Sequence, residues 1–177
     1  ATQSLMPAGK QSSLETLRSN PEKWAAVQQG IEDQRDHFDG LALQIGQHYG
    51  RDSAPDLRAK DFQFCDVGAR FPHTWLSVDN IEASSLDLLS ATEFTLVLRN
   101  GVSLPSINGE VPLQIKVEGD HFNTSEKNLK TLGMDDAVAV LVRPDGHISA
   151  RFGEGELTQG AVTESLKKAA AKFMAFA

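Results

Sequence analysis

The sequence contains a single cysteine and no apolar run long enough to cross a membrane. Cys65 has no second cysteine in its own chain to pair with, which is typical of a protein from a reducing cytosol. The longest apolar runs, such as residues 137–142, are far shorter than the roughly 20 residues that a bilayer requires. We therefore expect a cytoplasmic protein that does not engage a membrane.

Basic residues are also in the minority. The chain has 17 Lys and Arg against 24 Asp and Glu, which gives a net charge of -7. A chain-wide attraction to phosphate groups is thereby excluded, so we do not expect a nucleic-acid partner. The 177 residues are 40% hydrophobic and 23% charged, a composition that is ordinary for one globular domain with an appendage.

Several motifs of cofactor and metal chemistry are missing as well. A single cysteine excludes a Cys-x-x-Cys redox centre, and the five histidines include no pair three or four residues apart on a predicted helix, so no metal site is predicted. The sequence has neither the G-x-G-x-x-G turn that holds a dinucleotide nor the phosphate-binding G-x-x-x-x-G-K-S/T loop nor the nucleophile elbow G-x-S-x-G. We therefore assign no catalytic, cofactor-binding or metal-binding residue to this chain.

The N-terminal part reads as a helical lead. Ser12 and Glu15 have the spacing of a capping box, and Asn20 followed by Pro21 predicts the start of a longer helix, which we expect to end at residues 39–40. A period of two over residues 41–45 then predicts a strand. We assign residues 1–50 to this lead, residues 51–60 to a linker rich in turn formers and charges, and residues 61–177 to one compact domain.

The compact domain alternates strand and helix patterns. Strands are predicted at residues 74–78, 94–98, 111–117, 137–142 and 147–152, and helices at 84–90, 124–132 and 160–176. The turn at 143–147 carries proline, aspartate and glycine and predicts a hairpin between the last two strands. This order predicts an α/β fold with a thioredoxin-like central mixed sheet and flanking helices.

A few polar residues are interleaved with the predicted core, and buried polar groups must find partners. We expect them to form a structural hydrogen-bond set, with a ligand pocket as the alternative. They are Arg70, His73, Asp87, His147 and Arg151.

Five blocks of the compact domain follow one another in a distinctive order. They are residues 68–76 (GARFPHTWL), 84–88 (SSLDL), 94–97 (FTLV), 111–113 (VPL) and 141–148 (LVRPDGHI), followed by Arg151. In this order they resemble the C-terminal thioredoxin-like domain of FAD-dependent phenol and chlorophenol hydroxylases, the group A aromatic flavoprotein monooxygenases. Upstream, residues 38–46 (FDGLALQIG) with Tyr49 are similar to the last helix and strand of the flavin-bearing portion of those enzymes.

The resemblance implies a limited role for this chain. In that family the preceding domains hold FAD and the phenol, and the C-terminal domain lacks redox cysteines and serves subunit packing and shielding of the catalytic part. The implied parent enzyme uses FAD and NAD(P)H, and the implied partners are its preceding domains or a second copy in a homo-oligomer. Two segments depart from the family pattern: residues 90–93 replace a glycine-containing turn, and residues 102–110 lack a tryptophan-bearing helix.

Two other functions stay open at this stage. A freestanding module of the same fold would bind a small molecule or a protein, with Arg70, His73 and Arg151 lining a pocket. A thiol peroxidase would need a thiolate with a lowered pKa, whereas Cys65 precedes the first core strand, where a small half-buried hydrophobic residue is the expected role.

Overall fold

The computed structural model describes residues 17–38, 46–50, 65–104, 106–107 and 110–174. The chain divides into two compact units, Ala1–Gln44 and Ile45–Ala177. The predicted capping box at 12–15, the predicted strand at 41–45 and the predicted linker at 51–60 lie outside the described residues. Among the described helices, none has the length and apolar character needed to cross a membrane.

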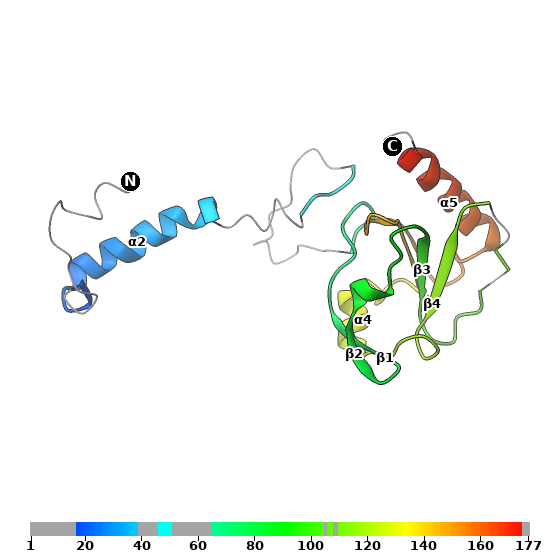
Figure 1. The fold of residues 1–177 in the computed structure, drawn as a ribbon, viewed down its shortest axis with the longest axis horizontal. Coiled ribbons are helices and arrows are strands. Elements are labelled where there is room, and N and C mark those ends of the chain that lie inside the picture. Colours follow the sequence, from blue (N-terminus) through cyan, green and yellow to red (C-terminus); the bar gives the residue numbers. More distant parts are fainter. Residues whose placement is uncertain (1–16, 39–45, 51–64, 105, 108–109, 175–177) are drawn as a thin grey trace. The chain divides into compact units, whose positions relative to one another are not determined.

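The first unit contains helix α2 (Pro21–Phe38), which begins where the sequence predicted (Figure 1). Asn20 caps it, because its side-chain oxygen accepts a hydrogen bond of 3.1 Å from the backbone N–H of Lys23. Apolar side chains recur along α2 at helical spacing and are only partly covered: Trp24 and Val27 are half-buried, and Ile31 is 65% exposed.

The second unit is built on a four-stranded sheet with the order β4-β3-β5-β6. Strand β3 (Phe94–Leu98) pairs in parallel with β4 (Leu113–Val117) and antiparallel with β5 (Ala139–Val142), which in turn pairs antiparallel with β6 (Ile148–Phe152). The predicted α/β class, the mixed sheet and the β5–β6 hairpin are confirmed. The thioredoxin-like assignment stays a prediction.

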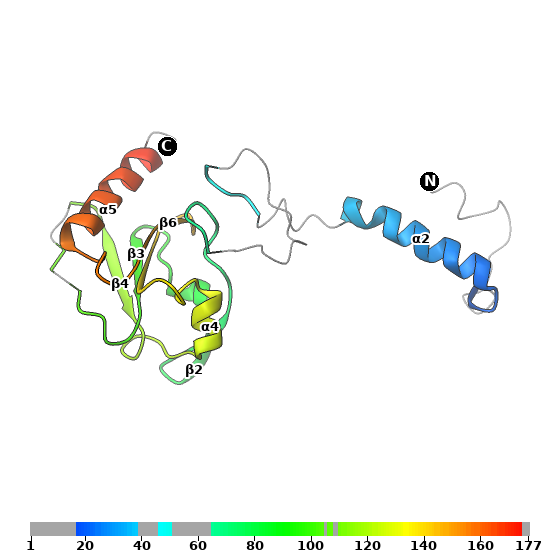
Figure 2. The same cartoon turned by 180° about the vertical axis from the view of Figure 1, so that it is seen from behind.

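The sheet separates two apolar cores, because side chains alternate between its faces. Leu96 and Leu98 of β3 pack with Val162 and Leu166 of helix α5 (Gln159–Met174). Val97 of β3 faces the other core, which includes Leu129 of helix α4 (Glu126–Thr131). Helices α4 and α5 therefore cover opposite faces of the sheet, as Figures 1 and 2 show.

A two-stranded sheet lies before the main sheet in the sequence, and only its first strand was predicted. Strand β1 (Trp75–Val78) pairs antiparallel with β2 (Ile81–Ser84), which sequence analysis missed. The two residues that join them, Asp79 and Asn80, both have positive φ, 51° and 64°, as a tight hairpin turn requires. The helix predicted at 84–90 is a short 3-10 helix, η2 (Ser85–Leu88).

The burial of β3 leads to a test of the fold. Leu96 is fully buried in the central strand, so Leu96→Ala should lower the free energy of unfolding by about 2–5 kcal/mol through lost apolar contact and the cavity left behind. Urea unfolding followed by circular dichroism measures this change. Lys127→Ala, an exposed position of α4, is the matched control and should change stability by less than about 0.5 kcal/mol. Equal losses in the two variants would contradict the fold.

Candidate functional site

The five polar residues predicted from the sequence occupy three separate places. The first contains Arg70 and His147, which face each other in an antiparallel bridge. Backbone hydrogen bonds of 2.8 Å on either side, from Phe71 N–H to the Gly146 oxygen and from Ile148 N–H to the Ala69 oxygen, add the segment 68–71 to the outer edge of β6. Arg70 itself is exposed and His147 is buried.

The second place is the start of η2, where Ser84 joins His73 and Asp87. The Ser84 hydroxyl lies 2.8 Å from Nδ1 of His73 and accepts a hydrogen bond from the backbone N–H of Leu86. The Asp87 carboxylate accepts a 2.9 Å hydrogen bond from the backbone N–H of Ser84, which completes a capping box. His73 and Asp87 therefore both have structural partners.

The third place surrounds Arg151 on β6. Its guanidinium donates to the backbone oxygen of Gly133 at 2.5 Å and pairs with the carboxylate of Asp136. Gly133 has a φ of +71°, and a Cβ there would lie 2.4 Å from Cβ of Cys65. The turn after α4 thus brings Arg151 and Cys65 together, a proximity that sequence analysis did not anticipate.

The environment of Cys65 disfavours a reactive thiolate. Burial raises the pKa of the Cys65 thiol above its ordinary value, and nearby Asp66 and Asp135 raise it further. Arg151 acts in the opposite direction but does not reverse the shift. Within the described ranges, no group of three His, Cys, Asp or Glu side chains is arranged to hold a metal ion.

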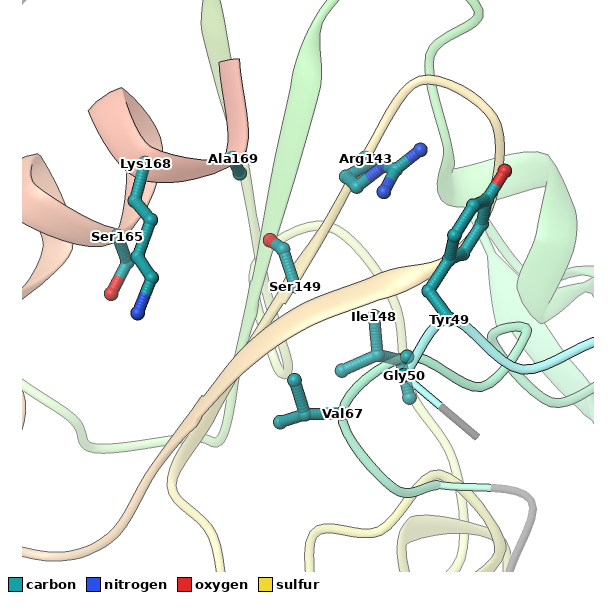
Figure 3. Close-up of a pocket in the computed structure, with 10 residues that line it drawn as sticks. Tyr49, Gly50, Val67, Arg143, Ile148, Ser149, Ser165, Lys168 and Ala169 are labelled. Carbon is teal, nitrogen blue, oxygen red and sulfur yellow. The ribbon is translucent and has the colours of Figure 1, made fainter. Parts of the chain in front are cut away.

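A cleft of about 540 Å³ lies elsewhere, between the segment 46–50, the edge of β6 and helix α5. None of the five predicted polar residues lines it. Figure 3 shows Tyr49 and Arg143 on one side of this cleft and Ser165 and Lys168 of α5 on the other. Its lining residues are Tyr49, Gly50, Val67, Gly68, Arg143, Ile148, Ser149, Ser165, Lys168 and Ala169.

Tyr49 is fixed at one wall of this cleft by its neighbours. The Arg143 guanidinium carbon lies 4.4 Å from the centre of the Tyr49 ring, a cation–π distance. The ring also meets His147 edge-on, with centroids 4.8 Å apart. The Tyr49 backbone N–H donates to the Gly68 oxygen at 2.9 Å. In the sequence, Tyr49 stood out only through the family resemblance, and Arg143 only through the turn 143–147 and one block of that resemblance, so their contact was not predicted.

Asp145 anchors the other side of that arrangement. Its carboxylate pairs with Arg143 and accepts a 3.2 Å hydrogen bond from the backbone N–H of His147. Nδ1 of His147 lies 3.4 Å from the same carboxylate, a distance that suits an ion pair when the imidazole is protonated but lacks hydrogen-bond geometry. The turn 143–147 therefore acts as a rigid support for Tyr49.

The described residues do not fit a flavin. A flavin pyrophosphate is usually held where a glycine-rich turn leads a strand into a helix, so that free backbone N–H groups face the phosphates. Here β4 leads to α4, but the cap residue Ser125 already accepts the backbone N–H of Asn128 with its own hydroxyl. The only glycine between these two elements, Gly119, donates its N–H to the oxygen of Phe122.

The turn from β6 to α5 contains two glycines, but its donors are occupied as well. The backbone N–H of Gly153 donates to the carboxylate of Glu156, and the hydroxyl of Thr158 accepts the N–H of Ala161 at the start of α5. A carboxylate held in this turn also repels a phosphate. Neither turn therefore suits the pyrophosphate of FAD.

The chain matches a known protein family. The family model described as "aromatic-ring hydroxylase, C-terminal" matches residues 65–175, which is well over half of the chain. A comparison with curated proteins finds no match.

Solved structures share this fold. The flavin-dependent monooxygenase PieE, solved with FAD and substrate, is 21% identical with a TM-score of 0.53 over 94% of this chain. RebC with bound 7-carboxy-K252c is 23% identical with a TM-score of 0.55 over 92% of this chain. Aklavinone-11 hydroxylase, solved with FAD and aklavinone, is 18% identical with a TM-score of 0.51 over 71%. The present chain spans only 30%, 30% and 27% of those three chains.

The contact between Gly68 and Tyr49 generates a stability test. Gly68 has a φ of +100°, and a Cβ there would lie 2.1 Å from the backbone oxygen of Tyr49. Gly68→Ala should therefore lower the free energy of unfolding by about 2–4 kcal/mol, through backbone strain and displacement of Tyr49. Gly101 has a φ of +75° but nothing within 4 Å, so Gly101→Ala isolates the backbone strain and should cost about 1 kcal/mol. Chemical denaturation measures the free energy of unfolding of both variants. Equal losses in the two variants would show that the contact between residue 68 and Tyr49 does not contribute to stability.

The raised pKa of Cys65 generates a test of reactivity. A raised pKa leaves less thiolate at neutral pH, so alkylation by iodoacetamide should be slow and should accelerate only at alkaline pH. The rate is measured against pH for the native chain and for the same chain in denaturant. We expect the midpoint of the native profile to lie above that of the unfolded chain. A native midpoint below the unfolded one would mean an activated thiol.

Proposed function

Because this chain belongs to the aromatic-ring hydroxylase C-terminal family, we propose that it is the accessory C-terminal domain of an FAD-dependent hydroxylase of phenol-type rings. In this proposal the domain carries out no redox chemistry and acts by packing against the preceding domains or a second subunit. The bound FAD of the parent enzyme supplies the chemistry between NAD(P)H, oxygen and the aromatic ring. The parent is expected in the cytoplasm.

Two observations support this proposal: the family match, and the small fraction of each relative's length to which this chain corresponds. The chain spans 30% of PieE and 27% of aklavinone-11 hydroxylase, both solved with FAD, and 30% of RebC. A piece of that size leaves most of the relatives' length outside the alignment. We infer that the flavin and the substrate belong to the part of the parent outside the described fold.

The chemistry of the described residues supports a redox-inactive role. Cys65 has a raised pKa, which disfavours its use as a nucleophile. His73 and Asp87 take part in the capping of η2, and Arg151 holds the turn after α4. Each of these polar groups thus has a structural use that requires no substrate.

The surface of the β1–β2 hairpin supports a packing role. Trp75 is 56% exposed and Ile81 is 70% exposed. The Trp75 backbone oxygen accepts a hydrogen bond of 2.8 Å from Asn128 of α4, so the strand that carries this ring is held in place. Exposed aromatic and aliphatic side chains on a rigid hairpin suit contact with another domain or subunit.

The topology supports the thioredoxin-like part of the proposal. That architecture combines a parallel pair of strands with an antiparallel hairpin and a final helix, and here β3–β4 and β5–β6 followed by α5 occupy those positions. The connection between β3 and β4 contains no helix among its described residues, which is consistent with the departure noted at residues 102–110.

The two alternative functions depend on different residues. A freestanding binding module that used Arg70, His73 and Arg151 would need them around one cavity, and none of them lines the cleft beside Tyr49. A thiol peroxidase would consume hydrogen peroxide in a reaction that disappears in Cys65→Ser. We expect no such consumption.

Flavin content tests the proposal directly. The purified 177-residue chain, mixed with excess FAD and then desalted, should be colourless and should not oxidise NAD(P)H in the presence of phenols. The reason is that the described residues provide no phosphate-binding turn for the flavin. Absorbance and fluorescence of the desalted protein measure retained FAD, with an intact flavin hydroxylase as the positive control. Retention of one flavin per chain would refute the accessory role.

A further inference from the structure

The cleft beside Tyr49 has walls from three separate parts of the second unit. Helix α5 contributes Ser165, Lys168 and Ala169, whose spacing of three and four residues places them on one helix face. The edge of β6 contributes Ile148 and Ser149. The third part consists of residues 49–50 and 67–68. Figure 3 shows these side chains around a common space, with Val67 low in the view.

The lining combines apolar and cationic groups without a negative charge. Val67 and the Tyr49 ring, both exposed, provide the apolar surface, whereas Ile148 and Ala169 line the cleft but are almost fully buried. Ser149 and Ser165 line the cleft with hydroxyl groups. The Ser149 hydroxyl already donates to the backbone oxygen of Leu141 at 3.2 Å, so it can only accept a further hydrogen bond, and Ser165 is the hydroxyl that can donate to a ligand. No Asp or Glu stands among the described residues that line the cleft, although acidic residues outnumber basic ones in the chain.

The two cations of the lining differ in what they can offer. Arg143 is paired with Asp145 and stacked on Tyr49, so its charge is largely compensated. Lys168 is exposed on α5, and no ion pair of Lys168 is found within the described part of the chain. A bound anion would therefore meet the ammonium of Lys168, with the Ser165 hydroxyl one helical turn away as a second donor.

We propose that this cleft binds a small organic anion with a flat or aliphatic apolar body, such as an aromatic carboxylate. The carboxylate lies at Lys168 and Ser165, and the apolar body lies against Val67 and the Tyr49 ring. The volume of about 540 Å³ falls in the range of roughly 300–1,000 Å³ that is usual for small-molecule sites. Inorganic phosphate is disfavoured, because it would leave the apolar surface in contact with water. Binding of such an anion by this cleft does not depend on the accessory role proposed above.

The test uses naphthoate as the probe and naphthamide as its uncharged counterpart. Both are titrated into the whole 177-residue chain, and binding is followed by intrinsic fluorescence and amide NMR shifts. Naphthoate should bind saturably and shift the amide resonances of residues 148–149 and 165–169. Naphthamide should bind at least about fivefold more weakly, because it lacks the charge that Lys168 recognises.

Two neighbouring lysines provide a matched pair of variants. Lys168→Met should weaken naphthoate binding by about fivefold and leave naphthamide unchanged. Lys167→Met removes the same charge from an exposed position next to it that does not line the cleft and should leave both affinities unchanged. Circular dichroism confirms that both variants are folded.

Three outcomes would overturn the proposal. One is the lack of saturable naphthoate binding to the folded chain. A second is equal weakening in Lys168→Met and Lys167→Met, which would show attraction to net charge alone. The third is a set of amide shifts centred on Trp75 and Ile81, which would place the probe on the exposed hairpin.

Discussion

The burial of β3 on both faces is the constraint on which the rest of the second unit depends. All five residues of Phe94–Leu98 are buried, so helices or loops must cover both faces of the sheet at this strand. Phe94, Leu96 and Leu98 define the core under α5, while Val97 belongs to the core that contains α4. Thr95 is the polar exception, and its hydroxyl accepts hydrogen bonds from Gln114 and from the backbone of Ser90. Each further element is placed by the need to cover this strand.

A second constraint operates at the outer edge of β6. An unpaired edge exposes backbone groups, and here the segment 68–71 pairs with residues 146–148 and satisfies part of that edge. The lack of a side chain at Gly68 lets Tyr49 approach, and Arg143 and His147 hold its ring. The cleft lies between this added segment, α5 and the first residues of β6, Ile148 and Ser149.

The sequence was sufficient for elements whose signal is local. The apolar run of β3 was predicted with its observed bounds, and Asn20 with Pro21 located the start of α2. Strand β2 was missed because its residues, Ile81–Ser84, are largely exposed and show little apolar alternation. The signal that could have found it was the Asp79-Asn80 turn after a predicted strand.

The site could not be predicted in the same way, because it depends on tertiary placement. Nothing in the sequence spacing links Tyr49 to Arg143, or Cys65 to Gly133, yet the structure brings both pairs into contact. The five polar residues looked like one set but lie in three places. The side chains of His73, Asp87 and Arg151 find local structural partners, and Arg70 and His147 are paired through their backbones. The family resemblance, by contrast, relied on ordered blocks of residues and agrees with the family match at 65–175.

The central claim is that this polypeptide builds a scaffold and does not itself carry an electron-transfer centre. The measurement that tests it most directly is an anaerobic reductive titration of the purified chain with dithionite, counted against protein concentration. The account predicts that the chain takes up no reducing equivalents. Stoichiometric uptake of one or two electrons per chain would contradict it, since it would reveal a redox group held by these residues alone.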